Sequence, residues 1–316
     1  MRFPFARILV PYDGSEVSDS ALQDAVTLAG PGTTLTLVNV VDQTPFVMQA
    51  SSAVAAYDPQ PMLDALQACG RAVLENGTAL ARKLGAEPQQ RLEMGAPVAG
   101  IVHAATATNA DLIVMGTHAH QGLKRAFLGS TTEGVLRSSD VPVLAVGPLT
   151  PGNLTLERIL VGVDDSEPAD AAVALSGAIA RATGAQLMMC TVVDTRDVDE
   201  KARDYGYDPT PIAQSMRAAG ERICERAQAS VKPAVVEGRV LEGEPVEALL
   251  QTAAGERAGL IVLGSHGRRG LGRMLFGSVA ERVVRASPLP VLVVRSAPKA
   301  FVTQASVVAG RAAAVV

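Results

Sequence analysis

The sequence carries one pattern of short motifs twice. ARILVPYDGSE (6–16) recurs as ERILVGVDDSE (157–167), and DLIVMGTHA (111–119) recurs as GLIVLGSHG (259–267). Four further pairs of motifs occur in the same order in both copies: TLTLVNVVD with AQLMMCTVVD, YDPQP with YDPTP, LEMGAPV with LEGEPV, and VPVLAV with LPVLVV. The offset between the copies stays between 148 and 152 residues, which indicates a tandem duplication. The chain is therefore expected to fold as two similar units.

The duplication also predicts the domain boundaries. We expect a first domain at residues 1–148, a linker at 149–156 and a second domain at 157–296. The linker holds a Pro-Gly pair, which is typical of a loop. The tail, residues 297–316, has no counterpart after the first copy. It is either an amphipathic addition used in assembly or a loosely ordered end, and we favour the second.

Within each copy, short β-rich runs alternate with Ala-rich stretches of helical spacing. In the first copy the runs are ILV, TLTLVNVV, QQRLEM, LIVMG and VPVLAV, and SDSALQDAVTLAG and PVAGIVHAATATNA lie between them. This order predicts right-handed βαβ crossovers and a parallel sheet covered on both faces. Each copy is therefore an α/β, doubly wound, five-stranded domain. Ligands of such sheets bind beyond the carboxyl ends of the strands, where the strand order reverses.

Composition limits the classes of function. The net charge is −4, which argues against a nucleic-acid-binding protein, because those usually carry a basic face. Cys69, Cys190 and Cys224 form no CxxC pair, as expected in a reducing compartment, and Cys190 is predicted to be buried. The N-terminus does not resemble a signal peptide, and no apolar run is long enough for a membrane helix. We expect a cytoplasmic protein.

A glycine-rich segment, GSHGRRGLGRMLFGS (264–278), follows the fourth strand of the second copy. Ser278 and Glu281 at its end match a capping box that opens a helix, where free N–H groups favour an anion. Gly264 and Gly267 allow the backbone to approach a ligand closely. Arg268 either supplies countercharge or is a solvated loop residue, and His266 either faces phosphates or is structural. The segment is predicted to hold phosphate groups.

The first copy has a related segment, GTHAHQGLKRAFLGS (116–130). It keeps Gly116 and Gly129, and Ser130 with Glu133 again matches a capping box. Ala119 stands where the second copy has Gly267, and its methyl group would crowd a phosphate or disfavour a positive φ. The first copy is therefore expected to hold the weaker site.

Other candidates follow the first and second strands of each copy. Asp13 and Asp164 come directly after ILV, where a carboxylate either accepts hydrogen bonds from a ribose or caps the next helix. Val40 and Val192, near the ends of the second strands, either line a slot for a flat base or belong to the core.

These motifs together resemble the universal stress protein family over residues 5–296. The spacing G264-x2-G267-x9-G277-S278 is similar to the nucleotide-binding pattern of that family. The resemblance implies a Rossmann-like, adenine nucleotide hydrolase-like fold. It also implies that VPVLAV and LPVLVV pair within one chain as an intramolecular pseudo-dimer.

The resemblance implies roles for individual residues. Asp164 and Asp13 would contact the ribose, and the backbone of Val192 and Val40 would contact adenine. The phosphates would be held in the second copy by Gly264, Gly267, Gly277, Ser278 and Val279, with His266 and Arg268 nearby. The first-copy equivalents are Gly116, Gly129, Ser130 and Thr131, with Ala119 the residue that departs from the pattern.

The function expected from this reading is ATP binding, with Mg²⁺ as an accompanying ion, by a stress-response sensor or regulator that acts through an unidentified protein partner. A homodimer of the tandem chain fits the same reading. The alternatives are slow hydrolysis of an adenine nucleotide and a nucleotide-free interaction module. The sequence has no P-loop, no G-x-S-x-G elbow and no Cys/His dyad, so we assign no catalytic residue. We expect no metal site at His118 and His120. Residues 43–62 and 195–212 are expected to be mobile segments that cover the nucleotide or contact a partner.

Overall fold

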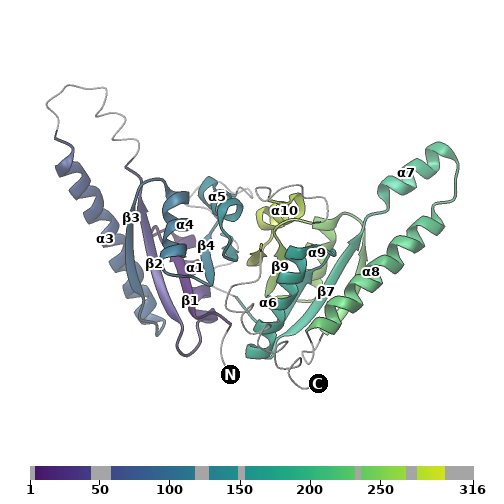
Figure 1. Ribbon diagram of the computed structural model, residues 1–316, viewed down its shortest axis with the longest axis horizontal. Helices are drawn as coiled ribbons and strands as arrows, with labels where there is room; N and C mark the ends of the chain where they lie inside the picture. The colour runs from purple at the N-terminus through teal and green to yellow at the C-terminus, as the bar shows by residue number, and fades with distance from the viewer. Residues whose placement is uncertain are drawn as a thin grey trace, which may run out of the picture. The chain divides into compact units, whose positions relative to one another are not determined.

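The computed structural model describes residues 4–43, 58–117, 128–148, 154–231, 236–267 and 276–295. The chain divides between residues 153 and 154 into two compact units, which we call domain 1 and domain 2 (Figure 1). The strand order is β3-β2-β1-β4-β5 in domain 1 and β8-β7-β6-β9-β10 in domain 2. All neighbouring strands within each domain run parallel. The predicted α/β, doubly wound, five-stranded fold of each repeat is confirmed.

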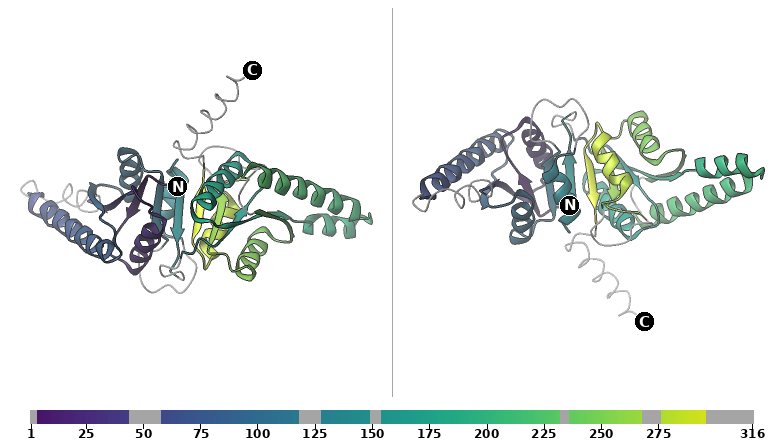
Figure 2. Two further views of the ribbon diagram at one scale, coloured as in Figure 1. Left: turned by 90° about the horizontal axis from the view of Figure 1, so that it is seen from below. Right: turned by 90° about the horizontal axis from the view of Figure 1, so that it is seen from above.

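Domain 1 alternates strand and helix along the chain. Its elements are β1 (Arg7–Pro11), α1 (Glu16–Leu28), β2 (Thr34–Val41), α3 (Gln60–Lys83), β3 (Gln89–Met94), α4 (Pro97–Ala107), β4 (Leu112–Gly116), α5 (Ser130–Ser138) and β5 (Val143–Val146). Helix α1 packs beside α3, and α4 packs beside α5. These two pairs cover opposite faces of the sheet (Figure 2).

Domain 2 repeats this arrangement and has a helix, α7, between β7 and α8. Its elements are β6 (Arg158–Gly162), α6 (Glu167–Thr183), β7 (Gln186–Val193), α7 (Arg196–Tyr205), α8 (Thr210–Ser230), β8 (Val236–Glu242), α9 (Pro245–Gly255), β9 (Leu260–Gly264), α10 (Ser278–Ala286) and β10 (Val291–Val294). Helix α6 packs beside α8, and α9 beside α10.

Helix α7 lies in a segment that was expected to be mobile. It begins after Thr195, carries Asp197 and Asp199 in its first turn, and ends at Gly206, which adopts the left-handed conformation at φ +69°. Acidic residues in a first turn complement the helix dipole, and a left-handed glycine is a common helix end. Figure 1 shows α7 and α8 extending beyond the carboxyl end of β7. These local signals specify a helix in a segment for which no secondary structure was predicted from the sequence. The expected mobility of residues 195–212, and their contact with a nucleotide or a partner, stay predictions.

The core of each domain lies around its two central strands. Three consecutive residues of β1 (Ile8–Val10) and of β6 (Ile159–Val161) are fully buried, as are their neighbours in β4 and β9. Continuous apolar runs of this kind belong to parallel strands that are covered on both faces. Cys190 and Cys224 are buried in domain 2, so the prediction for Cys190 is confirmed. Burial raises the pKa of the Cys190 thiol to about 12, which keeps it protonated near neutral pH.

Three further predictions remain untested: those for the tail, for the segment after β2, and for the pairing of the last strands. The tail 297–316 and residues 44–57 lie outside the described residues. The pairing of the two repeats through their last strands stays a prediction.

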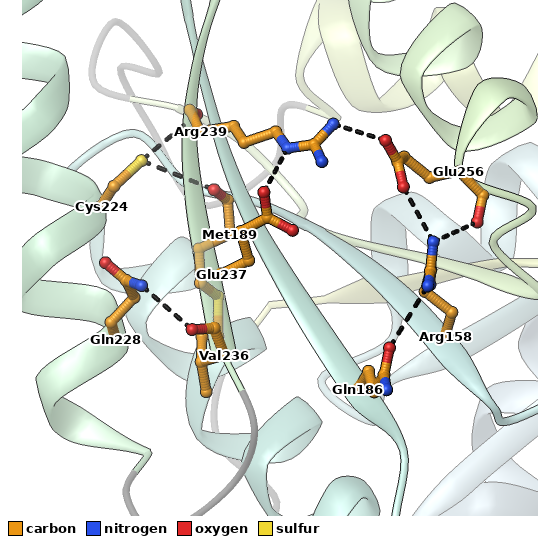
Figure 3. Close-up of polar contacts among 9 residues, drawn as sticks. All are labelled: Arg158, Gln186, Met189, Cys224, Gln228, Val236, Glu237, Arg239 and Glu256. Carbon is orange, nitrogen blue, oxygen red and sulfur yellow. Dashed lines mark hydrogen bonds and ion pairs between the residues drawn. The ribbon is translucent and has the colours of Figure 1, made fainter.

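One polar network ties the start of β6 to the C-terminal end of α9 (Figure 3). The Glu256 carboxylate accepts hydrogen bonds from Arg158 at 2.8 Å and from Arg239 on β8 at 2.6 Å. Arg158 also donates to the Glu256 carbonyl at 3.0 Å and to Gln186 at 3.3 Å. Arg158 therefore satisfies a backbone carbonyl at the end of α9 that has no partner within the helix, and Arg239 is joined to it through the Glu256 carboxylate.

We expect Glu256→Ala to destabilise domain 2 by about 1 kcal/mol, because both arginines lose a partner but are partly solvated. Glu237→Ala is the matched control, since Glu237 is 57% exposed and contacts Arg239 alone among the ion pairs described here. Its expected cost is below about 0.5 kcal/mol. Chemical denaturation followed by circular dichroism measures both changes. Equal costs for the two variants would contradict a special role for the network.

Candidate functional site

The segments after β6 and β9 meet at the carboxyl edge of domain 2. Strand β6 lies between β7 and β9, so the chain leaves β6 toward one side of the sheet and returns on the other. Asp164 follows β6, and His266 and Gly267 follow β9. This edge is the switch point at which ligands of doubly wound sheets bind.

Asp164 is held by the turn that opens α6. Its Oδ1 accepts a hydrogen bond from the Ser166 backbone N–H at 3.2 Å and from the Ser166 hydroxyl at 2.6 Å. Ser166, not Asp164, is the N-cap of α6, and its side chain accepts from the Ala169 N–H. The helix-capping alternative for Asp164 was therefore wrong. The carboxylate is half-buried and oriented toward the edge by a capping serine that the sequence reading overlooked.

Gly267 lies directly against that carboxylate. A Cβ added at Gly267 would stand 2.3 Å from Oδ2 of Asp164, closer than any real contact. The Ser166 hydroxyl also lies 3.3 Å from the carbonyl oxygen of His266. Two predicted residues from distant parts of the chain, Asp164 and Gly267, are thus brought together, and glycine is required for that approach.

Gly277 closes the other end of the segment. Its N–H donates to the Ser265 carbonyl at 2.7 Å, and an added Cβ would stand 2.8 Å from Cα of His266. His266 is half-buried, and its Nδ1 lies 3.0 Å from the Ser265 hydroxyl. The two ends of the glycine-rich segment therefore touch.

The predicted capping boxes are absent from α10 and α5. Gly277 is the N-cap of α10, with no side-chain capping hydrogen bond, so Ser278 is the first helical residue. Glu281 pairs with Arg285 one turn later, at 2.9 Å, instead of reaching back. In α5, Gly129 is the N-cap and Glu133 pairs with Arg137. In neither helix does the N-cap residue offer a side chain to the N–H groups of the first turn.

Gly264 and Gly116 have a packing role. A Cβ at Gly264 would stand 2.8 Å from the backbone of Pro168 and of Ala169 in the first turn of α6. At Gly116 it would stand 2.7 Å from Val17 in α1. These glycines let a helix start lie against the end of the fourth strand of each repeat, which positions Asp164 and Asp13 nearby.

The remaining predicted residues occupy the same edge of each sheet. Val192 lies on β7 beyond Cys190, the partner of the last residue of β6, and is half-buried. Val279 is half-buried, and Ser278 is exposed at the start of α10. Arg268 lies outside the described residues.

Domain 1 has the same frame with differences in detail. Asp13 is exposed, and its Oδ1 accepts from the Ser15 N–H at 3.0 Å and from the Ser15 hydroxyl at 2.6 Å. Ser15 is the N-cap of α1, so the capping alternative for Asp13 was also wrong. The Gly129 N–H donates to the Thr117 carbonyl at 2.7 Å. Val40 is half-buried on β2, its side chain against Gly100 of α4. Ser130 is exposed, Thr131 is half-buried, and Ala119 lies outside the described residues.

A separate pocket of about 250 Å³ opens between α7, α8 and the ends of β7 and β8. It is lined by Val193, Thr195, Asp199, Pro209, Thr210, Ala213, Gln214, Arg217 and Glu242. None of these residues was named as a site residue, although Thr195, Asp199, Pro209 and Thr210 lie in the segment 195–212 that was expected to cover the nucleotide or contact a partner. In the described part of the chain, no group of three or more His, Cys, Asp or Glu side chains is placed to hold a metal ion.

The described segments contain no helix that is both long and apolar enough to cross a membrane.

Comparison with known proteins shows the family to which the chain is similar. The family model of the universal stress proteins matches residues 4–147 and again 155–295. A universal stress protein of Mycobacterium tuberculosis is 28% identical over 301 residues, covering 91% of this chain and 96% of that protein. One of Thermus aquaticus is 36% identical over 142 residues, covering 44% of this chain and 98% of that protein.

Among solved structures, a universal stress protein of Archaeoglobus fulgidus matches with a TM-score of 0.68 and 25% identity, covering 93% of this chain and 99% of that one. The chain therefore belongs to the universal stress protein family, as a member with two tandem domains.

Proposed function

We propose that domain 2 binds ATP and that the protein is a cytoplasmic, nucleotide-dependent sensor or regulator of a stress response. The observation that supports this most directly is the approach of Gly267 to Asp164. It brings the main chain after β9 beside a carboxylate after β6, so that one ligand can contact both. A ribose hydroxyl donates well to a carboxylate, and phosphates accept from backbone N–H groups.

The residues divide between the parts of the nucleotide. Asp164, fixed by Ser166, accepts from the ribose hydroxyls. The backbone of Val192 contacts adenine, and the first-turn N–H groups of Ser278 and Val279 donate to phosphates. The uncapped start of α10 supports this assignment, because its partial positive charge favours an anion.

Gly264 and Gly277 shape the walls of the site, and His266 would lie beside the phosphates. Arg268, outside the described residues, is assigned to the phosphates from the sequence motif alone. Mg²⁺ would be held chiefly by the phosphates themselves, because this ion is bound with few protein carboxylates when a nucleotide is present.

In domain 1 the same positions, Asp13, Val40, Gly116, Gly129, Ser130 and Thr131, form a weaker site. Ala119 replaces the glycine that in domain 2 lies against the carboxylate. A protein partner would bind differently to the ATP-bound and the ATP-free protein. A homodimer of the tandem chain would respond to bound ATP in the same way. A partner responds to ATP only if the two nucleotide states differ in their affinity for it.

The nucleotide content of the purified protein tests this proposal. The protein is denatured, the released small molecules are separated by chromatography, and the protein is quantified in parallel. We expect about one ATP per chain, from domain 2 alone. About two per chain would mean that Ala119 is tolerated in domain 1. ADP or AMP instead would favour slow hydrolysis. A protein that is empty and takes up no added ATP would contradict the proposal and favour an interaction module.

A further inference from the structure

The turn between β6 and α6 contains a non-glycine residue in the left-handed conformation. Asp165, which separates Asp164 from Ser166, has a φ of +69°. Domain 1 has Gly14 at the matching position, with a φ of +80°. Glycine adopts this conformation readily, whereas a residue with a side chain does so at a cost in free energy. Domain 2 therefore keeps the left-handed backbone conformation of this turn, although aspartate stands there in place of glycine.

The Asp165 side chain forms a contact that glycine cannot form. Its carboxylate pairs with the guanidinium of Arg226, which lies on α8 and 61 positions further along the chain. The corresponding position of domain 1, taken at the 150-residue offset of the YDPQP and YDPTP motifs, is Asn76. Both members of the pair are thus particular to domain 2.

This ion pair connects α8 to the turn that orients Asp164. Asp165 is the chain neighbour of both Asp164 and Ser166. Ser166 in turn donates two hydrogen bonds to the Asp164 carboxylate. A restraint on Asp165 therefore restrains the direction of that carboxylate. In domain 1 the matching Asp13 has the serine contacts without the second tether, and it is exposed.

We propose that Arg226 is a positioning residue for the nucleotide site of domain 2: by pairing with Asp165 it holds Asp164 in the orientation that accepts the ribose hydroxyls. This inference rests on the proposed ATP site and adds a residue outside the nucleotide-binding motif. Arg226 acts through Asp165 and Asp164 and does not itself contact the nucleotide.

The test compares ATP with 2′,3′-dideoxy-ATP, which lacks the hydroxyls that Asp164 would bind. Titration calorimetry on the full chain measures both affinities for the unaltered protein and for Arg226→Ala. The pair is about half exposed, so we expect a roughly two- to five-fold weaker affinity for ATP and little change for the dideoxy analogue. The difference should shrink at about 1 M salt, because exposed charges are then screened.

Three further variants isolate the cause. Arg222→Ala removes the same charge from an exposed position one turn earlier on α8 and should leave both affinities unchanged. Arg226→Lys should restore part of the preference for ATP. Asp165→Gly introduces the residue of domain 1 and should weaken ATP binding as Arg226→Ala does, with no further loss when the two are combined.

The outcomes separate this inference from the proposed function. Binding of ATP by the unaltered chain together with equal losses for both ligands, or no loss, in Arg226→Ala would overturn the positioning role alone. No binding of ATP by the unaltered chain would overturn both.

Discussion

Replacing Gly277 with aspartate should abolish ATP binding by domain 2, with a loss of affinity of at least about 100-fold. The added Cβ would stand 2.8 Å from Cα of His266 and 3.1 Å from the Ser265 carbonyl oxygen, so the backbone at the helix start must shift. The new carboxylate would also sit at the N-cap of α10. Aspartate there accepts from the first-turn N–H groups, which are the donors assigned to the phosphates. It places a negative charge where the phosphates must bind.

Two controls separate the charge from the steric effect and domain 2 from domain 1. Gly277→Ala introduces the Cβ without the carboxylate and should lose less affinity. Gly129→Asp makes the same change at the N-cap of α5 and should leave the domain 2 site unchanged. Nucleotide content and titration calorimetry measure all three variants, with circular dichroism to verify folding. If Gly277→Asp bound ATP as tightly as the unaltered protein, the assignment of phosphates to the start of α10 would be wrong.

The fold could be predicted from the sequence because its signals are local and occur twice. Each buried strand is a short apolar run, and each run has a counterpart in the other repeat. The Asp-x-Ser-Glu sequence at 13–16 and 164–167 also contained the signal for Ser15 and Ser166 as helix N-caps, since serine followed by an acidic first turn is a common helix start. That signal should have assigned the capping role to the serines and left the aspartates to the site.

The capping boxes at Ser130 and Ser278 were predicted wrongly because the same letters satisfy two patterns. A glutamate three residues after a serine can reach back to a helix start, or it can pair with an arginine four residues ahead. Arg285 follows Glu281 at that spacing, and the structure has the ion pair. The preceding glycine, extended at φ −68° and ψ 141°, takes the N-cap position instead.

The contacts that shape the site could not be read from the sequence at all. Gly267 meets Asp164 across about a hundred residues, and Arg226 meets Asp165 across 61 positions. Both depend on how helices and strand ends are packed, and no local motif encodes that distance. In domain 2, Gly267 therefore permits a close approach of the main chain to a carboxylate, in addition to the approach to a ligand that we propose.

The reciprocal exchange of Gly267 and Ala119 should move ATP affinity in opposite directions in the two domains. In Gly267→Ala the new methyl carbon would stand 2.3 Å from Oδ2 of Asp164, so the carboxylate must turn away from its Ser166 contacts or the loop must retreat. Either movement separates the ribose and phosphate contacts. We expect a roughly ten-fold weaker affinity in domain 2, the loss of about one charge-assisted hydrogen bond.

Ala119→Gly restores the family glycine in domain 1 and should raise the ATP content above that of the unaltered chain.

For Gly267→Ala in domain 2, Asp164→Ala is the diagnostic background, because it removes the carboxylate with which the introduced methyl group would clash. Adding Gly267→Ala to that background should then cost little, so the two changes are non-additive. Calorimetric titration of the four chains measures the coupling. Full additivity would mean that Gly267 acts on the nucleotide independently of Asp164. An unchanged domain 1 in Ala119→Gly would mean that the methyl group is not what weakens that site. The cause would then lie in another difference between the domains, such as the exposure of Asp13 or the lack of an ion pair at Gly14.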